Sequence, residues 1–142
     1  SRSRPGVPST PGLIMPSVVF DASALLALLR DEVGANVVAA HIGDGVISAV
    51  NLQEVIKELI RRGISLDASI EMLDALHLDV RSHDREGAIA AAALYPATRE
   101  YGCGLGDRTC MALAIAEGLP ALTADRAWER VEASGLQIKL VR

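Results

Sequence analysis

The chain has 142 residues, the size of a single domain, and half of them are apolar, which is enough to close a hydrophobic core and excludes a disordered chain. A net charge of −4 and only four aromatic residues argue against binding nucleic acid by overall charge or by stacking bases on aromatic side chains. No apolar run reaches the roughly 18 residues of a membrane span, and two cysteines without CxxC spacing favour a soluble domain of a reducing compartment, the cytoplasm.

Residues 1–14 differ in composition from the rest of the chain. They contain three of the six prolines, show no hydrophobic periodicity and run into Met15. We interpret them as a vector-derived tag before a native start at Met15, with a flexible native arm as the alternative. Residues 15–142 then hold twelve basic and eighteen acidic residues, a net charge of −6, so a polyanionic ligand would need positive charge supplied at its site.

Short apolar strands alternate with helices along residues 15–142, which we expect to form one domain. In chain order, the pattern predicts a strand at 17–20, helices at 22–32 and 34–42, a strand at 46–48, helices at 49–62 and 66–76, a strand at 78–80, helices at 86–95 and 107–118, a strand at 120–123, a short helix around Trp128 and a strand at 137–141. Strands separated by helices predict right-handed crossovers and an α/β fold, with a parallel sheet flanked by helices on both faces.

Acidic residues follow the expected strands. Asp21 comes directly after the first strand, and Asp125 follows the fourth strand by one residue. Asp107 begins a helix after the glycine-rich CGLG, and Glu54 lies in the first turns of the helix after 46–48. Because ligands bind outside the carboxyl ends of parallel strands, four acids from four segments can share one cleft there.

Carboxylates gathered in this way suit a hard divalent cation such as Mg²⁺ or Mn²⁺. Asn51 lies on the same helical face as Glu54 and is a further polar candidate. The alternative is that each aspartate merely caps a helix N-terminus, that Glu54 is a solvated acid, and that Ser23 and Thr123 are capping hydroxyls.

Three segments together resemble a known family. VVFDASALLALL, VISAVNLQEVIKEL and GLGDRTCMALAIAEGLPALTADRAW resemble the PIN-domain endoribonucleases, specifically the VapC-type toxins of bacterial toxin–antitoxin pairs, over residues 17 to 142. The third segment carries the most specific pattern, on Asp107, Met111, Ala112, Ala114, Gly118, Pro120, Thr123 and Asp125. The departures from that pattern are mild: Trp128 stands where many members have Phe, and Cys110 lies within the segment.

The resemblance implies a PIN-like domain and a role for each acid. It assigns Asp21, Glu54, Asp107 and Asp125 as catalytic and as ligands of Mg²⁺ or Mn²⁺, supported by the polar side chains of Ser23, Asn51 and Thr123. The implied reaction is metal-assisted hydrolysis of RNA that leaves 5′-phosphate and 3′-hydroxyl ends. We expect Arg108 and Arg126, beside two of the acids, to contact RNA phosphates, or else to be solvated surface residues.

The resemblance also implies partners. We expect a cognate VapB-like antitoxin that covers exposed apolar positions at 25–29 and 37–42, and a homodimer formed through the early helices. The first alternative is a non-catalytic α/β binding module of PIN-like fold. The second is a receiver-like phosphoacceptor domain, which is disfavoured because neither Lys57 nor Lys139 is placed at a strand end opposite the acceptor aspartate.

Overall fold

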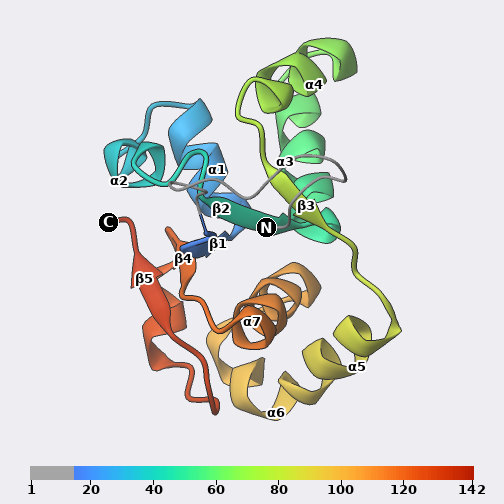
Figure 1. Ribbon diagram of the computed structural model, residues 1–142, viewed down its shortest axis with the longest axis vertical. Coiled ribbons are helices and arrows are strands. Elements are labelled where there is room, and N and C mark those ends of the chain that lie inside the picture. Colours follow the sequence, from blue (N-terminus) through green and yellow to red (C-terminus); the bar gives the residue numbers. More distant parts are fainter. Residues whose placement is uncertain (1–14) are drawn as a thin grey trace, which may run out of the picture.

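A computed structural model describes residues 15–142, so the predicted tag at 1–14 lies outside the described residues. Its centre is a five-stranded parallel sheet in the order β3-β2-β1-β4-β5 (Figure 1). The strands are β1 (Val18–Phe20), β2 (Gly45–Ser48), β3 (Asp79–Arg81), β4 (Ala121–Thr123) and β5 (Ile138–Leu140). This arrangement confirms the predicted parallel α/β sheet.

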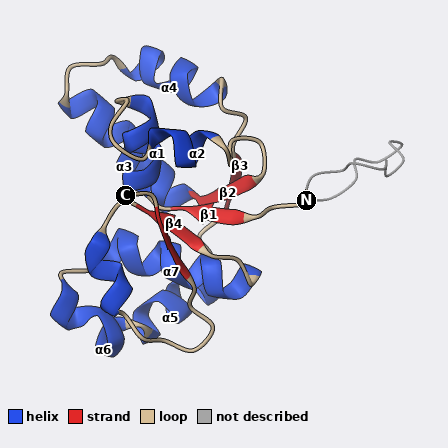
Figure 2. Cartoon of the chain, turned by 90° about the vertical axis from the view of Figure 1, so that its left-hand side faces the viewer, coloured by secondary structure: helices blue, strands red, loops and turns tan. Residues whose placement is uncertain are grey.

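Helices cover both faces of the sheet, as Figure 2 shows. One face carries α1 (Ala22–Leu29), α2 (Ala35–Ala39), α3 (Ala49–Arg61) and α4 (Leu66–Asp74). The other carries α5 (Arg85–Ala93), α6 (Tyr95–Thr98) and α7 (Leu105–Glu117). Two short 3-10 helices, η1 (Arg99–Tyr101) and η2 (Arg126–Arg130), complete the described elements.

The three central strands, β1, β2 and β4, are buried along their whole length and are mostly apolar because both of their faces are covered. In β1, Phe20 packs into the core under α1 to α4, whereas the neighbouring Val19 packs into the core under α7. In β2, Ile47 packs into the core under α1 to α4 and Val46 into the core under α7. Burying each such side chain contributes roughly 1.5–3 kcal/mol, so the rigid centre of the domain fixes where the strand ends point.

Two local predictions differ from the structure near α7. The helix begins at Leu105 and not at Asp107, because Gly104 is its N-cap and Asp107 is its third residue, within the first turn. The residues before it form α6 and η1, which the sequence did not indicate, with Pro96 in the first turn of α6. Gly104 and Gly106, on both sides of Leu105, are typical of a loop, so the sequence pattern placed the start of the helix two residues too late.

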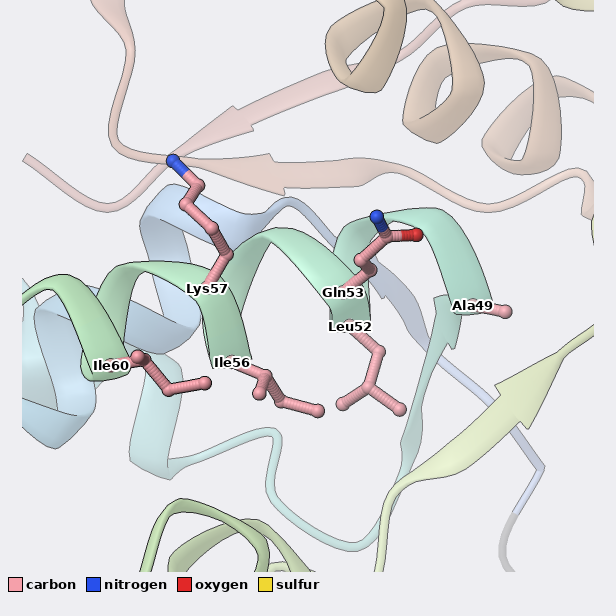
Figure 3. A pocket seen from close by; sticks show the side chains of 6 residues that line it. All are labelled: Ala49, Leu52, Gln53, Ile56, Lys57 and Ile60. Carbon is pink, nitrogen blue, oxygen red and sulfur yellow. The ribbon is translucent and has the colours of Figure 1, made fainter. Parts of the chain in front are cut away.

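The prediction of an exposed apolar partner surface at 25–29 and 37–42 is wrong for the residues at its centre. Leu25 and Val38 are completely buried, and their larger apolar neighbours are only partly exposed because they pack on the same core. An apolar groove of about 430 Å³ lies instead along α3, where Leu52, Ile56 and Ile60 project to one side of the helix (Figure 3). No helix among residues 15–142 is long and apolar enough to cross a membrane.

Candidate active site

The four predicted acids meet at the carboxyl edge of the sheet. Asp21 directly follows β1, Asp125 follows β4, Glu54 lies in the second turn of α3 behind β2, and Asp107 lies in the first turn of α7. All four line a single pocket of about 240 Å³, together with Ser23. The parallel sheet therefore delivers acids from four separate segments to one place.

Asp21 is the deepest of these acids, with only 4% of its surface exposed. Its Oδ2 accepts hydrogen bonds from Ser23 Oγ at 2.6 Å and from Thr123 Oγ1 at 2.8 Å. Burial raises the pKa of Asp21 from 3.8 to about 7, and the charges of Asp107 and Glu54 act in the same direction, whereas the two hydroxyl donors oppose the rise. Asp21 is thus a carboxyl group whose charge needs a counter-ion.

The two predicted supporting hydroxyls also fix the neighbouring backbone. Ser23 Oγ accepts a hydrogen bond from the backbone N–H of Ala124 at 2.9 Å, and Thr123 Oγ1 accepts one from the N–H of Asp125 at 3.1 Å. The two hydroxyl oxygens lie 3.2 Å apart. This network joins the end of β1 to the end of β4 and thereby sets the position of Asp125 relative to Asp21.

The helix-cap alternative holds for some of the acids only. Asp21 occupies the N-cap of α1 but accepts no capping hydrogen bond there. Asp125 does cap η2, where its Oδ1 accepts from the N–H of Ala127 at 3.0 Å. Asp107 Oδ2 accepts from the N–H of Gly104 at 2.8 Å, which leaves its other oxygen for the pocket. Capping thus explains Asp125 and part of Asp107 but not Asp21.

Asn51 positions Glu54. The Asn51 side chain is fully buried, and its Nδ2 donates to Glu54 Oε1 at 2.7 Å and to the carbonyl of Gly106 at 2.9 Å. Burial raises the pKa of Glu54, with help from the charge of Asp107, while Asn51 and Lys57 oppose the rise. The predicted polar role of Asn51 therefore takes a specific form, a bridge from α3 to the first turn of α7.

Asp107 completes the electrostatic picture. Its pKa is raised, chiefly by burial and also by the charge of Asp125, against the Gly104 N–H and the Arg108 guanidinium. Burial raises the pKa of three carboxyl groups in this pocket, and mutual repulsion adds to the rise in each. Such a pocket attracts cations.

The two predicted RNA-contacting arginines bind partners outside the pocket. Arg108 Nη1 donates to the carbonyl of Cys103 at 2.9 Å, and its guanidinium lies 5.5 Å from the centre of the Tyr95 ring. Arg126 Nη1 donates to the carbonyl of Arg142 at 3.1 Å. Neither lines the acid pocket, so neither is placed to contact a phosphate bound inside it, and a contact of either arginine with RNA outside the pocket stays a prediction.

Other basic side chains line the pocket in their place. They are Arg30, at the end of α1, and Lys57, one turn beyond Glu54 on α3, with Glu58 beside it. Helical spacing could have found Lys57, since residues three apart share a face with Glu54. Arg30 could not be found in that way, because its place depends on how α1 packs beside α3.

The donor set of the pocket fits a hard cation. Within residues 15–142, no three acidic, cysteine or histidine side chains form a cluster tight enough to hold an ion by themselves. Mg²⁺, however, usually takes one or two carboxylates and completes its shell with waters and substrate phosphate. Burial raises the pKa of the Cys103 thiol to about 11 and that of the Cys110 thiol well above its usual value, so neither free cysteine offers a thiolate. The oxygen donors of the four acids therefore fit Mg²⁺ or Mn²⁺.

Comparison with known proteins identifies the fold. The family model of the PIN domain matches residues 18–134. No curated protein sequence matches the chain. Among solved structures, the DNA-bound VapBC of Salmonella typhimurium has a TM-score of 0.69 at 18% identity, covering 90% of this chain and 100% of that one.

Two further structures have the same fold. The toxin–antitoxin complex from Klebsiella pneumoniae has a TM-score of 0.65 at 20% identity over 84% of this chain and 95% of that chain. VapBC2 from Rickettsia felis, bound to a DNA fragment of its promoter, has a TM-score of 0.67 at 15% identity over 89% and 98%. The sheet, the site at its carboxyl edge and the matched family model lead to one conclusion: the chain belongs to the PIN domain family.

Proposed function

We propose that this protein is a Mg²⁺- or Mn²⁺-dependent endoribonuclease toxin of the VapC type. The observation that carries the proposal is the pocket at the carboxyl edge of the sheet, in which Asp21, Glu54, Asp107 and Asp125 converge from four elements. Since three of these acids have raised pKa values, the pocket favours a cation as its ligand. The similarity to VapBC structures supports the toxin class.

In the proposed reaction, the four carboxylates would hold one or two ions, which supply a water of lowered pKa and neutralise the scissile phosphate. The residues of the chain prepare this site. Ser23 and Thr123 orient the Asp21 carboxylate, while Asn51 orients that of Glu54. Attack of water on the phosphorus, with the 3′ oxygen of the preceding nucleotide as the leaving group, would leave 5′-phosphate and 3′-hydroxyl ends.

Incubation of the protein with total RNA tests the proposal. We expect new 5′-phosphate ends with Mg²⁺ or Mn²⁺ and none with EDTA, read by sequencing the 5′ ends. Asp107→Asn is the matched control, because its amide oxygen can still accept the hydrogen bond from Gly104. RNA that stays intact with the wild-type protein and both metals would support the alternative, a non-catalytic binding module.

The same class implies partners. We propose that a cognate VapB-like antitoxin binds this protein and that the protein forms a homodimer, in a reducing cytoplasm that suits its two free cysteines. Co-expression with the neighbouring small open reading frame and pull-down tests the first point, and absence of any small co-purifying protein contradicts it. A light-scattering mass of one chain at micromolar concentration contradicts the second.

A further inference from the structure

Basic side chains gather beside the acid pocket, and two of them, Arg30 and Lys57, line it. Three basic side chains along α3 surround a single carboxylate, that of Glu58. They are Lys57 and Arg61, in the last turns of α3, and Arg62, directly after the helix. Lys57 Nζ lies 3.3 Å from Glu58 Oε2, Arg61 Nε donates to Glu58 Oε1 at 2.9 Å, and Arg62 Nε lies 3.5 Å from the same oxygen. Three positive charges around one negative charge leave a local excess of two.

Positive charges also outnumber negative ones at the end of α1. Arg30 pairs with Glu32, and Arg142 Nη1 lies 3.2 Å from the same carboxylate. Two guanidinium groups therefore share one acid. We call Arg30, Lys57, Arg61 and Arg62 the basic wall. Its positive excess stands out on a chain whose net charge is −4.

The basic wall is continuous with the acid pocket. Arg30 and Lys57 line that pocket directly, beside Glu54 and Asp107. Along α3, steps of three and four residues lead from Glu54 to Lys57 and on to Arg61, so the three side chains share one face of the helix over about 10 Å. Figure 3 shows the Lys57 side chain pointing away from those of Leu52 and Ile56. Lys57 also lines the edge of the apolar groove, so the basic wall borders that groove.

These side chains are available to a ligand. The side chains of Lys57, Arg61 and Arg62 are 66%, 60% and 45% exposed. Exposed ion pairs of this kind are weak and are screened by salt. An incoming phosphate can therefore replace the Glu58 carboxylate as the partner of these side chains at a small cost in free energy. Guanidinium and ammonium groups bind phosphate oxygens well, and Arg does so through two hydrogen bonds.

We propose that the basic wall binds the backbone phosphates of single-stranded RNA on one side of the scissile phosphate, so that the strand leaves the acid pocket along the last turns of α3. This inference rests on the proposed ribonuclease function. An RNA backbone is favoured over an acidic protein segment because the wall opens directly into the pocket where the scissile phosphate would lie. The binding is to the backbone and carries no sequence preference of its own.

The test measures RNA binding as a function of salt. A fluorescein-labelled single-stranded RNA is titrated with the full chain carrying Asp107→Asn, which prevents cleavage, and with the same protein carrying Lys57→Gln, Arg61→Gln and Arg62→Gln. Each lost phosphate contact lowers the slope of log Kd against log salt by about 0.7 for a single strand. We expect the slope to fall by about 2 and the affinity at low salt to fall at least tenfold.

A matched control changes three arginines elsewhere. Arg85→Gln, Arg99→Gln and Arg130→Gln remove the same charge from exposed positions on α5, η1 and η2, none of which lines the acid pocket. We expect this control to keep most of the slope of the parent. Equal losses in the two triple variants would mean that only net charge matters and would overturn the proposal. If the wall variant melts well below the parent, the single variants Lys57→Gln and Arg61→Gln replace it.

The remaining outcomes separate this inference from the proposed function. Cleavage by the wild-type chain with Mg²⁺, together with an unchanged KM for RNA in the wall variant without Asp107→Asn, overturns the basic wall and leaves the ribonuclease intact. A wall variant that keeps its RNA slope but no longer retains the co-expressed antitoxin overturns the RNA proposal in favour of an acidic protein partner. A wild-type chain that neither cleaves nor binds RNA overturns both.

Discussion

Gly106 in α7 lies directly against the carboxylate of Glu54 in α3. A Cβ atom at residue 106 would stand 2.2 Å from Glu54 Oε1 and 2.5 Å from Oε2, so close that one of the two side chains would have to shift. Asn51 draws the two together, since its Nδ2 bonds both to Glu54 and to the Gly106 carbonyl. Glu54 therefore keeps its present position in the pocket because residue 106 has no side chain, and a Cβ atom there would force the carboxylate to move.

Substitution of Gly106 should displace Glu54. We expect Gly106→Ala to lower metal-dependent RNA cleavage at least tenfold and to weaken the rise in melting temperature with Mn²⁺. The metal-free protein should stay within about 1 kcal/mol of the parent, because alanine favours a helix by about that amount and the Glu54 side chain can rotate away. Cleavage assays and melting curves with EDTA and with Mn²⁺ measure both effects.

Gly104→Ala is the matched control, since nothing lies within 4 Å of a Cβ at that position and the backbone N–H that binds Asp107 remains. It should keep the metal response. Adding Glu54→Asp to Gly106→Ala withdraws the carboxylate by one methylene and should restore part of the response. Equal metal responses of the two alanine variants would show that the Gly106 contact has no role.

Neutralising Asp107 should relieve repulsion and remove the metal response together. Two unit charges about 5 Å apart at an effective dielectric of about 20 repel by roughly 3 kcal/mol. Asp107→Asn should therefore leave the metal-free protein as stable as the parent or more so, abolish cleavage and blunt the Mn²⁺-dependent rise in melting temperature. Equal Mn²⁺-dependent rises in melting temperature in the two proteins would mean that Asp107 binds no metal and only accepts the hydrogen bond from Gly104 at the start of the helix.

The stability of the metal-free protein should fall as pH rises from about 4 to 7. In the folded state Asp21 keeps its proton up to about pH 7, whereas the unfolded chain releases it near 3.8, so the folded state binds more protons in this range. A difference of that size corresponds to roughly 4 kcal/mol. Asp21→Asn cannot ionise and should flatten the slope, measured by urea unfolding in EDTA.

Part of the slope should survive in Asp21→Asn, because the pKa values of Glu54 and Asp107 are raised in the same direction. Mn²⁺ should reverse the trend in the parent, since it binds the ionised carboxylates and its affinity grows with pH. Parallel pH profiles of parent and variant would show that Asp21 ionises normally in the folded protein.

The hydroxyl group of Thr123 should contribute more to stability and to cleavage than its methyl group does. It donates to Asp21 and accepts from the N–H of Asp125, and the residue is fully buried. Thr123→Val leaves that N–H without its partner and should lower the free energy of unfolding by about 1–3 kcal/mol, with loss of cleavage. Thr123→Ser keeps the hydroxyl and should lose only about 1 kcal/mol for the missing methyl group, while cleavage persists. Similar activity in both variants would argue against the hydroxyl network.

The parts of the site that depend on topology were predictable from the sequence. Uninterrupted apolar runs marked strands buried on both faces, and parallel strands bring their carboxyl ends to one edge. Asp21 and Asp125 therefore had to lie near each other once the order of strands and helices was clear. The approximate place of Glu54 followed from the helix after β2.

The parts that depend on packing between helices were not predictable in this way. Gly106 was read as a loop residue, and its role exists only because α3 and α7 come together there. Arg108 lies next to an acid in sequence, but the Cys103 carbonyl and the Tyr95 ring hold it elsewhere. Adjacency in sequence fixes a backbone position and leaves the direction of a long side chain to its neighbours.

The hydrogen bond between Thr123 and Asp21 joins residues 102 positions apart, and β4 is the strand that pairs with β1 on that side. A chain still being synthesised from its N-terminus thus holds Asp21, Glu54 and Asp107 before it has the strand that closes their pocket. On the proposed function, this order of assembly would keep the site incomplete, and the chain inactive, until β4 has been synthesised and has paired with β1.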